Sequence, residues 1–408
     1  MGFSRTVAAA ASASLPQNPK NHHAFRVAIV GGSLGGLATA NALQSTGRFQ
    51  IIHVYERAPG PLDQKGSGLG YVNVAAWEAL RNDEVPMMRR GRRAHRHQGS
   101  FYYGDLWKYL YQGLPPGTVR FGQTIEKLTM NNNNDSDNGR GSTVSIDKEE
   151  YDLVVVSDGG FSKLRKYVLR DDALDDNSNN NCKSPHNNDD YYQVEPEYAG
   201  YVVWRGAVSI SKIPLHILPR IHEGVYKNGI YDTILLRQAK DNGEDLWTMG
   251  TFIKTPEDEV DQYWNKATDG TSRHGSINDN KKNVMPDWLI QHFTDHFSNT
   301  PGLVELMECI RQHGEVSPHP QYEFGRIEKV HEGRVVILGD AAHMASPRTA
   351  VGAHTAILDA LALKDSFEKE PPESNIDAVL ELYSHAGLRH ARELYARSRE
   401  VSSEFIGD

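Results

Sequence analysis

Short apolar runs, often β-branched, recur along the chain and alternate with segments whose apolar residues follow a helical spacing. The runs at 27–30, 51–55, 151–156 and 334–338 hold few polar side chains, which is typical of strands buried on both faces of a parallel sheet. Leu34, Ala38 and Ala42 lie one turn apart and predict a helix after the first run. Further helices are predicted at 75–80, 103–111, 288–297, 303–312, 352–364 and 376–406, the last capped by Asn375 or Ser374.

The pattern changes between residues 198 and 330. Segments 201–210, 230–237 and 246–254 carry aromatic and β-branched residues in partial alternation, which predicts a mostly antiparallel sheet. Strands are also predicted at 119–128 and 143–146, paired as a hairpin whose tip is the Asn-rich segment 131–141. A second Asn/Asp tract, 171–190, is the predicted boundary between two regions.

Composition narrows the classes of function. The 408 residues carry a formal net charge of -9, which argues against a nucleic-acid partner, because phosphate binding needs positive potential. No run of about 18 apolar residues occurs, so we expect no membrane span. The two cysteines, Cys182 and Cys309, lack metal or disulfide spacing and predict reduced thiols in a cytoplasmic protein. Residues 1–23 contain basic residues, Ala and Ser but no acid, so organelle targeting stays open beside a disordered leader.

The first apolar run leads into a glycine turn with the features of a dinucleotide site. Gly31 suits the sharp reversal, and Gly36 suits close packing of helix on strand. Ser33 stands at the middle position, usually glycine, where its hydroxyl and amide can donate to a phosphate at the helix N-terminus. Glu56 follows Gly36 by 20 residues at the end of the second strand, where a carboxylate can accept from ribose hydroxyls.

Two later strand ends indicate which dinucleotide binds. The run at 334–338 leads into Gly339 and Asp340, and the run at 151–156 leads into Asp158 and Gly159. Asp340 is placed to hydrogen-bond a ribityl chain. The helix beginning near Gly352 is placed to direct its positive end at a flavin pyrimidine, which becomes anionic on reduction.

These three motifs together resemble the FAD-dependent aromatic hydroxylases, whose fold is that of p-hydroxybenzoate hydroxylase. Residues 31–33, 103–106, 198–206 and 339–342 are similar to the 2,6-dihydroxypyridine 3-monooxygenase branch. The resemblance implies an α/β fold: a Rossmann-like FAD-binding domain, an inserted mostly antiparallel β-sheet substrate domain and a C-terminal helical segment. The implied division is a leader at 1–23, FAD-binding parts at 24–190 and 331–408, the latter with the C-terminal helices, and a substrate-binding domain at 191–330.

The resemblance also implies the reaction. NADPH or NADH reduces FAD, O2 adds to form a flavin C4a-hydroperoxide, and an electron-rich aromatic or N-heteroaromatic ring is hydroxylated. The implied partners are this small ring substrate and O2, and a homodimer is left open. The implied cofactor-binding residues are Gly31, Ser33, Leu34, Gly36, Glu56, Arg57, Asp158, Asp340, Gly352 and Ala353.

The sequence names no catalytic base. His343, Trp204 and Arg205 are pocket candidates, each with a structural alternative: capping of a turn for His343, core packing for Trp204 and an internal ion pair for Arg205. No cluster has metal-ligand spacing, so we expect no metal. Two other functions stay open: a flavin-binding sensor or scaffold without hydroxylase activity, and a flavin oxidoreductase of the same fold with a different reaction.

Overall fold

The structure is a computed structural model in which eleven segments are described. These are residues 25–62, 68–69, 73–81, 101–131, 142–169, 195–227, 231–240, 243–260, 285–300, 302–371 and 374–407. The predicted leader at 1–23, residues 132–141 of the predicted hairpin tip and the tract at 171–190 lie outside them, as does Cys182.

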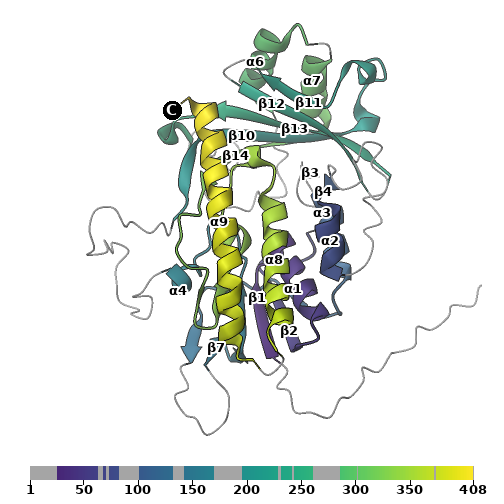
Figure 1. The fold of residues 1–408 in the computed structure, drawn as a ribbon. Helices are drawn as coiled ribbons and strands as arrows, with labels where there is room; N and C mark the ends of the chain where they lie inside the picture. Colours follow the sequence, from purple (N-terminus) through teal and green to yellow (C-terminus); the bar gives the residue numbers. More distant parts are fainter. Residues whose placement is uncertain are drawn as a thin grey trace, which may run out of the picture.

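A six-stranded sheet forms the centre of the larger part of the molecule (Figure 1). All its strands run parallel except β15 at one edge, which is antiparallel. The four residues of β9 and the last four of β1 are buried, as the apolar runs predict. The strand order is β15 (His331–Glu332), β16 (Val335–Ile337), β9 (Leu153–Val156), β1 (Phe25–Val30), β2 (Phe49–Glu56) and β5 (Val119–Phe121).

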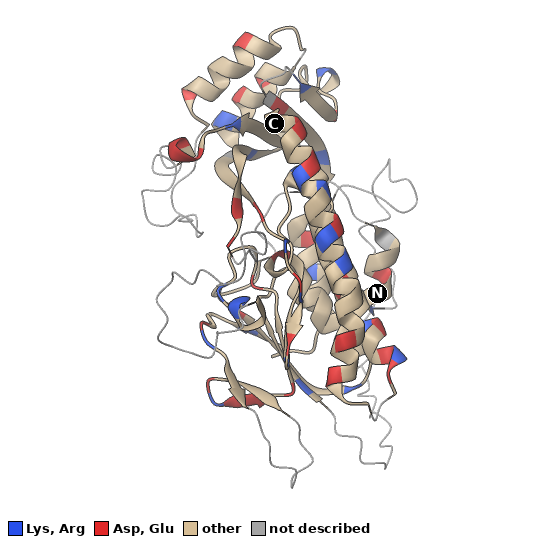
Figure 2. Ribbon diagram, turned by 60° about the vertical axis from the view of Figure 1, so that its left-hand side comes forward, with Lys and Arg blue, Asp and Glu red and all other residues tan. Residues whose placement is uncertain are grey.

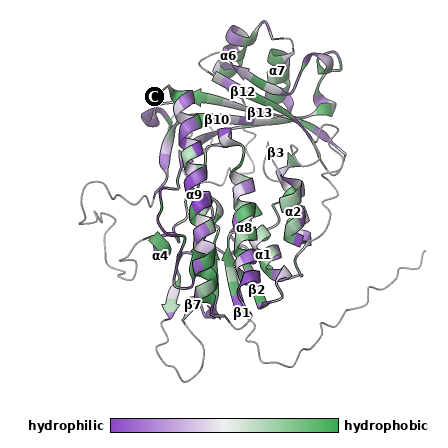
Figure 3. Cartoon of the chain, viewed as in Figure 1, coloured by the Kyte–Doolittle hydropathy of each residue, from purple (hydrophilic) through white to green (hydrophobic). Residues whose placement is uncertain are grey.

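Helices cover one face of this sheet. Helix α1 (Leu34–Ser45) lies in the middle and packs against α2 (Val74–Arg81), α3 (Tyr103–Gln112) and α8 (Gly352–Lys369). In Figure 3 the strand β1 between the layers is hydrophobic, whereas α9 (Ile376–Ile406), outside α8, carries many hydrophilic positions.

A small antiparallel sheet covers part of the opposite face. It consists of β6 (Thr129–Asn131), β7 (Thr143–Ile146) and β8 (Glu149–Tyr151), and it contacts β1 and β9. The short helix α4 (Lys166–Leu169) packs against β15 and β16.

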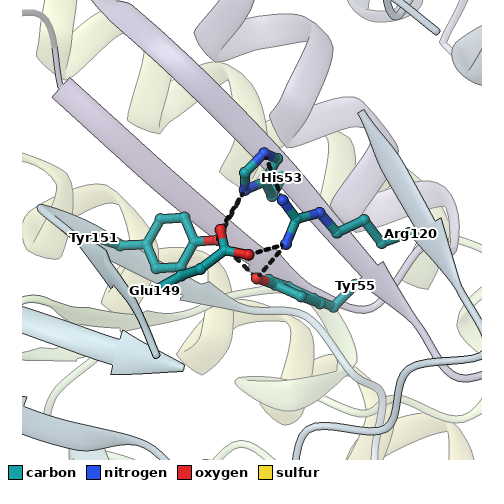
Figure 4. A network of polar contacts seen from close by, with 5 residues as sticks. All are labelled: His53, Tyr55, Arg120, Glu149 and Tyr151. Atoms are coloured by element: carbon teal, nitrogen blue, oxygen red, sulfur yellow. Dashed lines mark hydrogen bonds and ion pairs between the residues drawn. The ribbon is translucent and has the colours of Figure 1, made fainter. Parts of the chain in front are cut away.

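Five polar side chains join the small sheet to the large one (Figure 4). The Tyr151 hydroxyl lies at their centre, 2.7 Å from Tyr55 Oη, 2.8 Å from His53 Nδ1 and 2.8 Å from Glu149 Oε2. Arg120 closes the network by donating to Glu149 Oε1 at 2.6 Å and to Tyr55 Oη at 3.0 Å. Burial and the Arg120 charge lower the pKa of His53, so its Nε2 can accept from Arg120 at 3.0 Å.

The second sheet is antiparallel and has the strand order β11-β12-β13-β10-β14. Helices α6 (Asp287–Phe297) and α7 (Leu303–His313) cover its outer face through an apolar cluster that includes Trp204, Met249 and Phe293. The strands are β11 (Gly224–Lys227), β12 (Tyr231–Ala239), β13 (Asp245–Lys254), β10 (Glu197–Ser209) and β14 (Glu315–Glu323). Strands β12, β13 and β10 correspond to predicted segments, whereas β11 and β14 were not predicted.

The long helix α9 connects the two parts. It packs on α8 at one end and on β10 and β14 at the other (Figure 1). Asn375 caps it by accepting a hydrogen bond from the backbone nitrogen of Asp377, which confirms one of the two predicted caps. Basic and acidic residues are interspersed along this helix (Figure 2). The buried Glu323 of β14 accepts hydrogen bonds from two α9 hydroxyls, Ser398 and Ser402, each at 2.6 Å.

The predicted hairpin strand at 119–128 was wrong. Residues 119–121 form β5 at the edge of the large sheet instead, and β6 is the partner of β7. Gly122 ends β5 with a φ of +72°, and its amide donates to the carbonyl of Ala58, which turns the chain away from the sheet. The predicted strand at 151–156 is likewise two strands, because Tyr151 belongs to β8 and Leu153 begins β9.

The predicted fold class is confirmed: a Rossmann-like sheet with helices, a mostly antiparallel second sheet and a C-terminal helix. Short pairings and turns complete it: β3 (Gly68–Leu69) with β4 (Phe101–Tyr102), and the 3-10 turns η3 (Ile210–Lys212), η4 (Leu218–Arg220), η5 (Glu257–Glu259), η6 (Gly339–Ala341) and η7 (Pro347–Thr349). Within the described part of the chain, every helix is too short or too polar to cross a membrane.

Candidate cofactor and active site

The carboxyl ends of four neighbouring parallel strands bring the sequence motifs to one edge of the large sheet. Gly31 follows β1, Glu56 ends β2, Asp158 follows β9 and Asp340 follows β16. In sheets of this kind, ligands bind beyond the carboxyl ends of the strands. The three motifs are therefore parts of one region of the fold.

The glycine turn has no room for side chains at its two ends. Gly31 has a φ of +107°, and a Cβ there would overlap the carbonyl of Ser157. A Cβ on Gly36 would overlap the carbonyl of Gly31, so α1 starts directly against the turn. Trp107 of α3 holds the turn from outside, its Nε1 donating to the carbonyl of Gly32 at 2.7 Å.

Glu56 is buried and joins the turn to β2. Its Oε2 accepts from the backbone nitrogen of Gly32 at 2.8 Å, and its Oε1 accepts from that of Ala58 at 2.7 Å. Two backbone donors hold the carboxylate at the strand end with lone pairs left for further donors. Burial raises the pKa of the Asp158 carboxyl, and the charge of Arg57, the residue after Glu56, opposes this shift, so the two side chains lie in the same neighbourhood.

The N-terminus of α1 makes no hydrogen bond to a capping side chain. Ser33 and Leu34 begin this 12-residue helix, so their backbone amides are available to an anion. The Ser33 hydroxyl lies 2.8 Å from the Tyr103 hydroxyl. Burial raises the pKa of Tyr103 to about 12, which keeps this hydroxyl a neutral donor beside the turn. The sequence did not place Tyr103 in the site.

Asp158 has an oxygen that no described residue satisfies. Its Oδ1 is buried without a hydrogen bond in the part of the chain that the structure describes, and burial raises the pKa of the carboxyl. Buried polar atoms are normally hydrogen-bonded, so this oxygen is placed for a donor from a bound molecule. The residues therefore fit a dinucleotide: a tight turn, free helix amides and carboxylates beside them.

Arg165 fixes the two later turns relative to each other. Its guanidinium is almost fully buried, lies 3.8 Å from the centre of the Phe324 ring and donates to the carbonyl of Gly160. It also lies 3.5 Å from the backbone oxygen of Asp340. Burial lowers the pKa of Arg165 to about 10, which leaves the group charged at neutral pH.

The Asp340 side chain is accessible to solvent, yet surrounding protein raises its pKa through desolvation. The charges of His343, Arg165 and Arg205 oppose this shift. His343 points away into the core, where its Nε2 lies 2.6 Å from Asp359 Oδ2. This supports the alternative of a turn-fixing role for His343.

Helix α8 begins at Gly352 without a side-chain cap, after Ala350 in the left-handed conformation with a φ of +57°. Ala353 packs against the core of the large sheet. The first amides of this 18-residue helix are free of intrahelical partners, as the flavin prediction requires.

The structure separates Trp204 from Arg205. Trp204 points to the outer face of the second sheet, where its ring lies 5.7 Å from that of Trp288. Arg205 is on the opposite face, where it interacts electrostatically with Asp340. Trp204 is therefore a core residue. Among the described residues, no group of His, Cys, Asp and Glu has the arrangement of a metal site.

Known proteins with similar sequences also include an FAD-binding family and monooxygenases. A family model described as an FAD binding domain matches residues 312–398, which include Asp340, Gly352 and Ala353. The chain is 25% identical to a 6-hydroxynicotinate 3-monooxygenase of Bordetella bronchiseptica, over 84% of this chain and 83% of that one. It is 23% identical to a 2,6-dihydroxypyridine 3-monooxygenase of Paenarthrobacter nicotinovorans, with the same coverage.

Solved structures share the fold. The 2,6-dihydroxypyridine-3-hydroxylase of Arthrobacter nicotinovorans superposes with a TM-score of 0.67 at 18% identity, covering 95% of this chain and 94% of that one. HpxO of Klebsiella pneumoniae, complexed with FAD and uric acid, gives a TM-score of 0.64 at 18% identity, with coverages of 95% and 90%. The chain carries an FAD-binding domain, has the fold of FAD-dependent hydroxylases and has aromatic monooxygenases as its homologues.

Proposed function

We propose that this protein is an FAD-dependent monooxygenase that hydroxylates an aromatic or N-heteroaromatic ring. In this reaction a ring C–H bond becomes a C–OH bond. The reaction consumes O2, a proton and NADPH or NADH, and it releases water and the oxidised nicotinamide. One oxygen atom enters the ring and the other leaves as water. FAD, when bound, supplies the redox chemistry that carries the two electrons of the nicotinamide hydride to O2.

The observation that supports this proposal is the gathering of three motifs at one sheet edge. The turn of Gly31 to Gly36, the Asp158 strand end and the Asp340 strand end converge there, and the second sheet faces Asp340 through Arg205. A simple nicotinamide dehydrogenase has no use for the last two strand ends. The homologues named above are monooxygenases of aromatic and heteroaromatic rings.

In this proposal the residues of the chain bind the cofactor and fix its orientation. The free amides at Ser33 and Leu34 hold a diphosphate, and Glu56 accepts from an adenosine ribose. Asp158 and Asp340 accept from hydroxyl or amide donors at the middle of the cofactor. Three further residues are proposed to contact the cofactor: Arg57 beside Asp158, and Gly352 and Ala353 at the start of α8.

We also propose a division into domains, because all the proposed cofactor-binding residues lie before residue 191 or after residue 330. Residues 24–190 and 331–408 then hold the cofactor, and 191–330 hold the substrate. We also propose a cytoplasmic location, because Cys309 is a buried free thiol and the sequence has no disulfide spacing.

The test is reconstitution of the purified protein with FAD, followed by NADPH and NADH oxidation with hydroxypyridines and phenols. A yellow protein whose nicotinamide oxidation increases with a ring compound, and which yields the hydroxylated ring, supports the proposal. Bound FAD without any ring-stimulated oxidation favours a sensor or scaffold. Hydrogen peroxide as the sole product of ring-stimulated oxidation contradicts hydroxylation.

A further inference from the structure

The turn η7 lies in the proposed cofactor-binding part of the chain, yet the second sheet and α9 hold it. It follows Ser346, which is fully buried and whose backbone nitrogen donates to the Ser398 hydroxyl of α9 at 2.7 Å. The Ser346 hydroxyl makes a hydrogen bond with the Tyr201 hydroxyl of β10. The same oxygen accepts from the backbone nitrogen of Arg348 at 3.1 Å, which closes the turn.

The Arg348 side chain makes a second attachment to the same two partners. Its Nη1 lies 2.8 Å from Oδ2 of Asp232 on β12. Its guanidinium carbon lies 4.4 Å from the centre of the Phe405 ring on α9 and 5.2 Å from that of Phe252 on β13. Contacts between a cation and an aromatic face are attractive, and more so where water is excluded. One side chain therefore joins η7 to two strands of the second sheet and to the end of α9.

The ion pair of Arg348 and Asp232 is largely removed from water. The exposed fraction of the side chain is 15% for Arg348 and 9% for Asp232. Separating such a pair leaves a poorly solvated charge, so the pair resists opening. Lys227 lies 4.0 Å from the same carboxylate oxygen, but 65% of its side chain is exposed, so water screens its charge. Arg348 is therefore the main counterion of Asp232.

The residues that follow η7 depend on this attachment. Ala350 ends the turn in the left-handed conformation with a φ of +57°, which a residue with a Cβ keeps when its surroundings hold it there. Helix α8 begins two residues later, at Gly352, without a side-chain cap. An uncapped helix end opens readily, so its position depends on the segment before it. Arg348 fixes that segment.

We propose that Arg348 is a positioning residue: by tying η7 to Asp232, it holds the start of α8 in place at the cofactor site. This inference rests on the proposed function, in which the start of α8 directs its positive potential at the flavin pyrimidine. That potential favours reduced flavin, whose pyrimidine is anionic, over oxidised flavin. The second sheet, which is the proposed substrate-binding part, thereby helps to set how easily the cofactor is reduced.

The first measurement needs no cofactor. The amide of Thr355 donates to the carbonyl of Val351 at 2.9 Å, so hydrogen exchange at residues 355–359 reports how often the start of α8 opens. We expect exchange there to be about tenfold or more faster in Arg348→Met than in the wild type, measured by mass spectrometry of the purified proteins. Arg348→Lys keeps the charge but not the planar donors and should show a smaller increase.

The second measurement uses the FAD-loaded protein and detects an effect that a merely stabilising ion pair would not have. When the start of α8 shifts, bound flavin loses part of the preference for its reduced form. We expect the affinity for reduced FAD relative to oxidised FAD to fall about tenfold in Arg348→Met, which lowers the two-electron midpoint potential by about 30 mV. Reduction in the presence of a reference dye, followed by absorbance, measures this potential.

Two control variants separate the position of α8 from general stability. Lys227→Met removes the other cation beside Asp232, and we expect it to change neither measurement. Arg334→Met removes a largely buried arginine at the other end of α9, where it donates to Asn375 Oδ1 at 3.0 Å. It should lower stability without changing the midpoint potential. Circular dichroism shows whether each variant is folded.

Two results overturn the inference. Unchanged exchange at residues 355–359 in Arg348→Met shows that the start of α8 does not depend on the ion pair. Faster exchange with the midpoint potential of the wild type shows that the pair is only structural. If the wild type takes up no FAD, the proposed function fails and with it the role of Arg348 at the cofactor, whereas the exchange measurement still decides whether Arg348 holds α8. The two failures are therefore distinguishable.

Discussion

Oδ2 of Asp359 lies 2.6 Å from Nε2 of His343 and 2.9 Å from the backbone nitrogen of Gly339. One carboxylate oxygen of α8 thus holds both ends of the turn that presents Asp340. The other oxygen lies 2.8 Å from Nδ1 of His390 on α9. Asp359 and His343 are almost fully buried, so the pair fixes the turn without contact with solvent.

The first prediction concerns Asp359→Asn. An amide cannot satisfy three donors, and the His343 charge loses its counterion. Breaking a buried pair by removing one partner costs about 3 kcal/mol or more, so we expect the free energy of unfolding to fall by that amount. We also expect weaker FAD binding, because the Asp340 turn loses its anchor. Urea unfolding and FAD titration measure the two effects.

The exposed Asp365 on the same helix provides the control, and Asp365→Asn should change neither quantity. An Asp359→Asn protein that is as stable as the wild type, with the same FAD affinity, would show that the turn does not depend on this pair.

The second prediction is the pH dependence of the same pair. Burial opposes the charge on His343, but the Asp359 carboxylate outweighs it and raises the pKa above the ordinary 6.5. Its stabilising contribution is therefore complete below about pH 6.5 and is lost as pH rises through the raised value. The imidazoles lower the pKa of Asp359 to about 2 despite burial, so its contribution is complete above its ordinary 3.8 and is lost as pH falls toward 2.

We therefore expect the stability difference between wild type and Asp359→Asn to be largest between about pH 4 and 6.5 and to shrink on both sides. Urea unfolding at pH values from 3 to 9 measures it. A difference that stays constant from pH 5 to pH 9 would show that His343 does not titrate in this range and would contradict the expected loss of stability at high pH.

Local signals explain why much of the fold could be predicted from the sequence. The apolar runs that became β1, β9 and β16 are short and buried on both faces, and Gly31 and Gly36 mark the turn between strand and helix. The Asp158 and Asp340 strand ends could be found because each follows such a run directly.

The parts that could not be predicted depend on long-range packing. β14 contains Pro318 and Pro320, which argue against a strand, yet β14 is an edge strand where missing amide donors are tolerated. Because β14 was missed, the strand beside β10 at this edge of the sheet could not be assigned. Asp359 gave no signal either, because a carboxylate at mid-helix is normally solvated and only the fold brings His343 to it.

The third prediction separates two adjacent glycines. A Cβ on Gly36 would overlap the carbonyl of Gly31, whereas a Cβ on Gly35 would lie 3.5 Å from the Cβ of Ala356 and fit. Gly36→Ala must push α1 away from the turn, so we expect FAD affinity to fall about tenfold or more. Gly35→Ala should bind FAD like the wild type. Titration followed by flavin fluorescence compares them, and equal affinities of the two variants would contradict the account of the turn.

The last prediction concerns Tyr151→Phe in the network of Figure 4. The substitution keeps the ring but removes the hydroxyl that Tyr55, His53 and Glu149 share. Tyr55 is buried and His53 and Glu149 are partly exposed. Because all three lose a hydrogen bond and water can replace it only at the two partly exposed ones, we expect the free energy of unfolding to fall by about 1 to 2 kcal/mol. FAD affinity should not change, since the network lies between the two sheets and the cofactor residues lie at the strand ends. Urea unfolding and FAD titration of the same protein separate the effects, and a loss of FAD affinity at unchanged stability would place this network in the site.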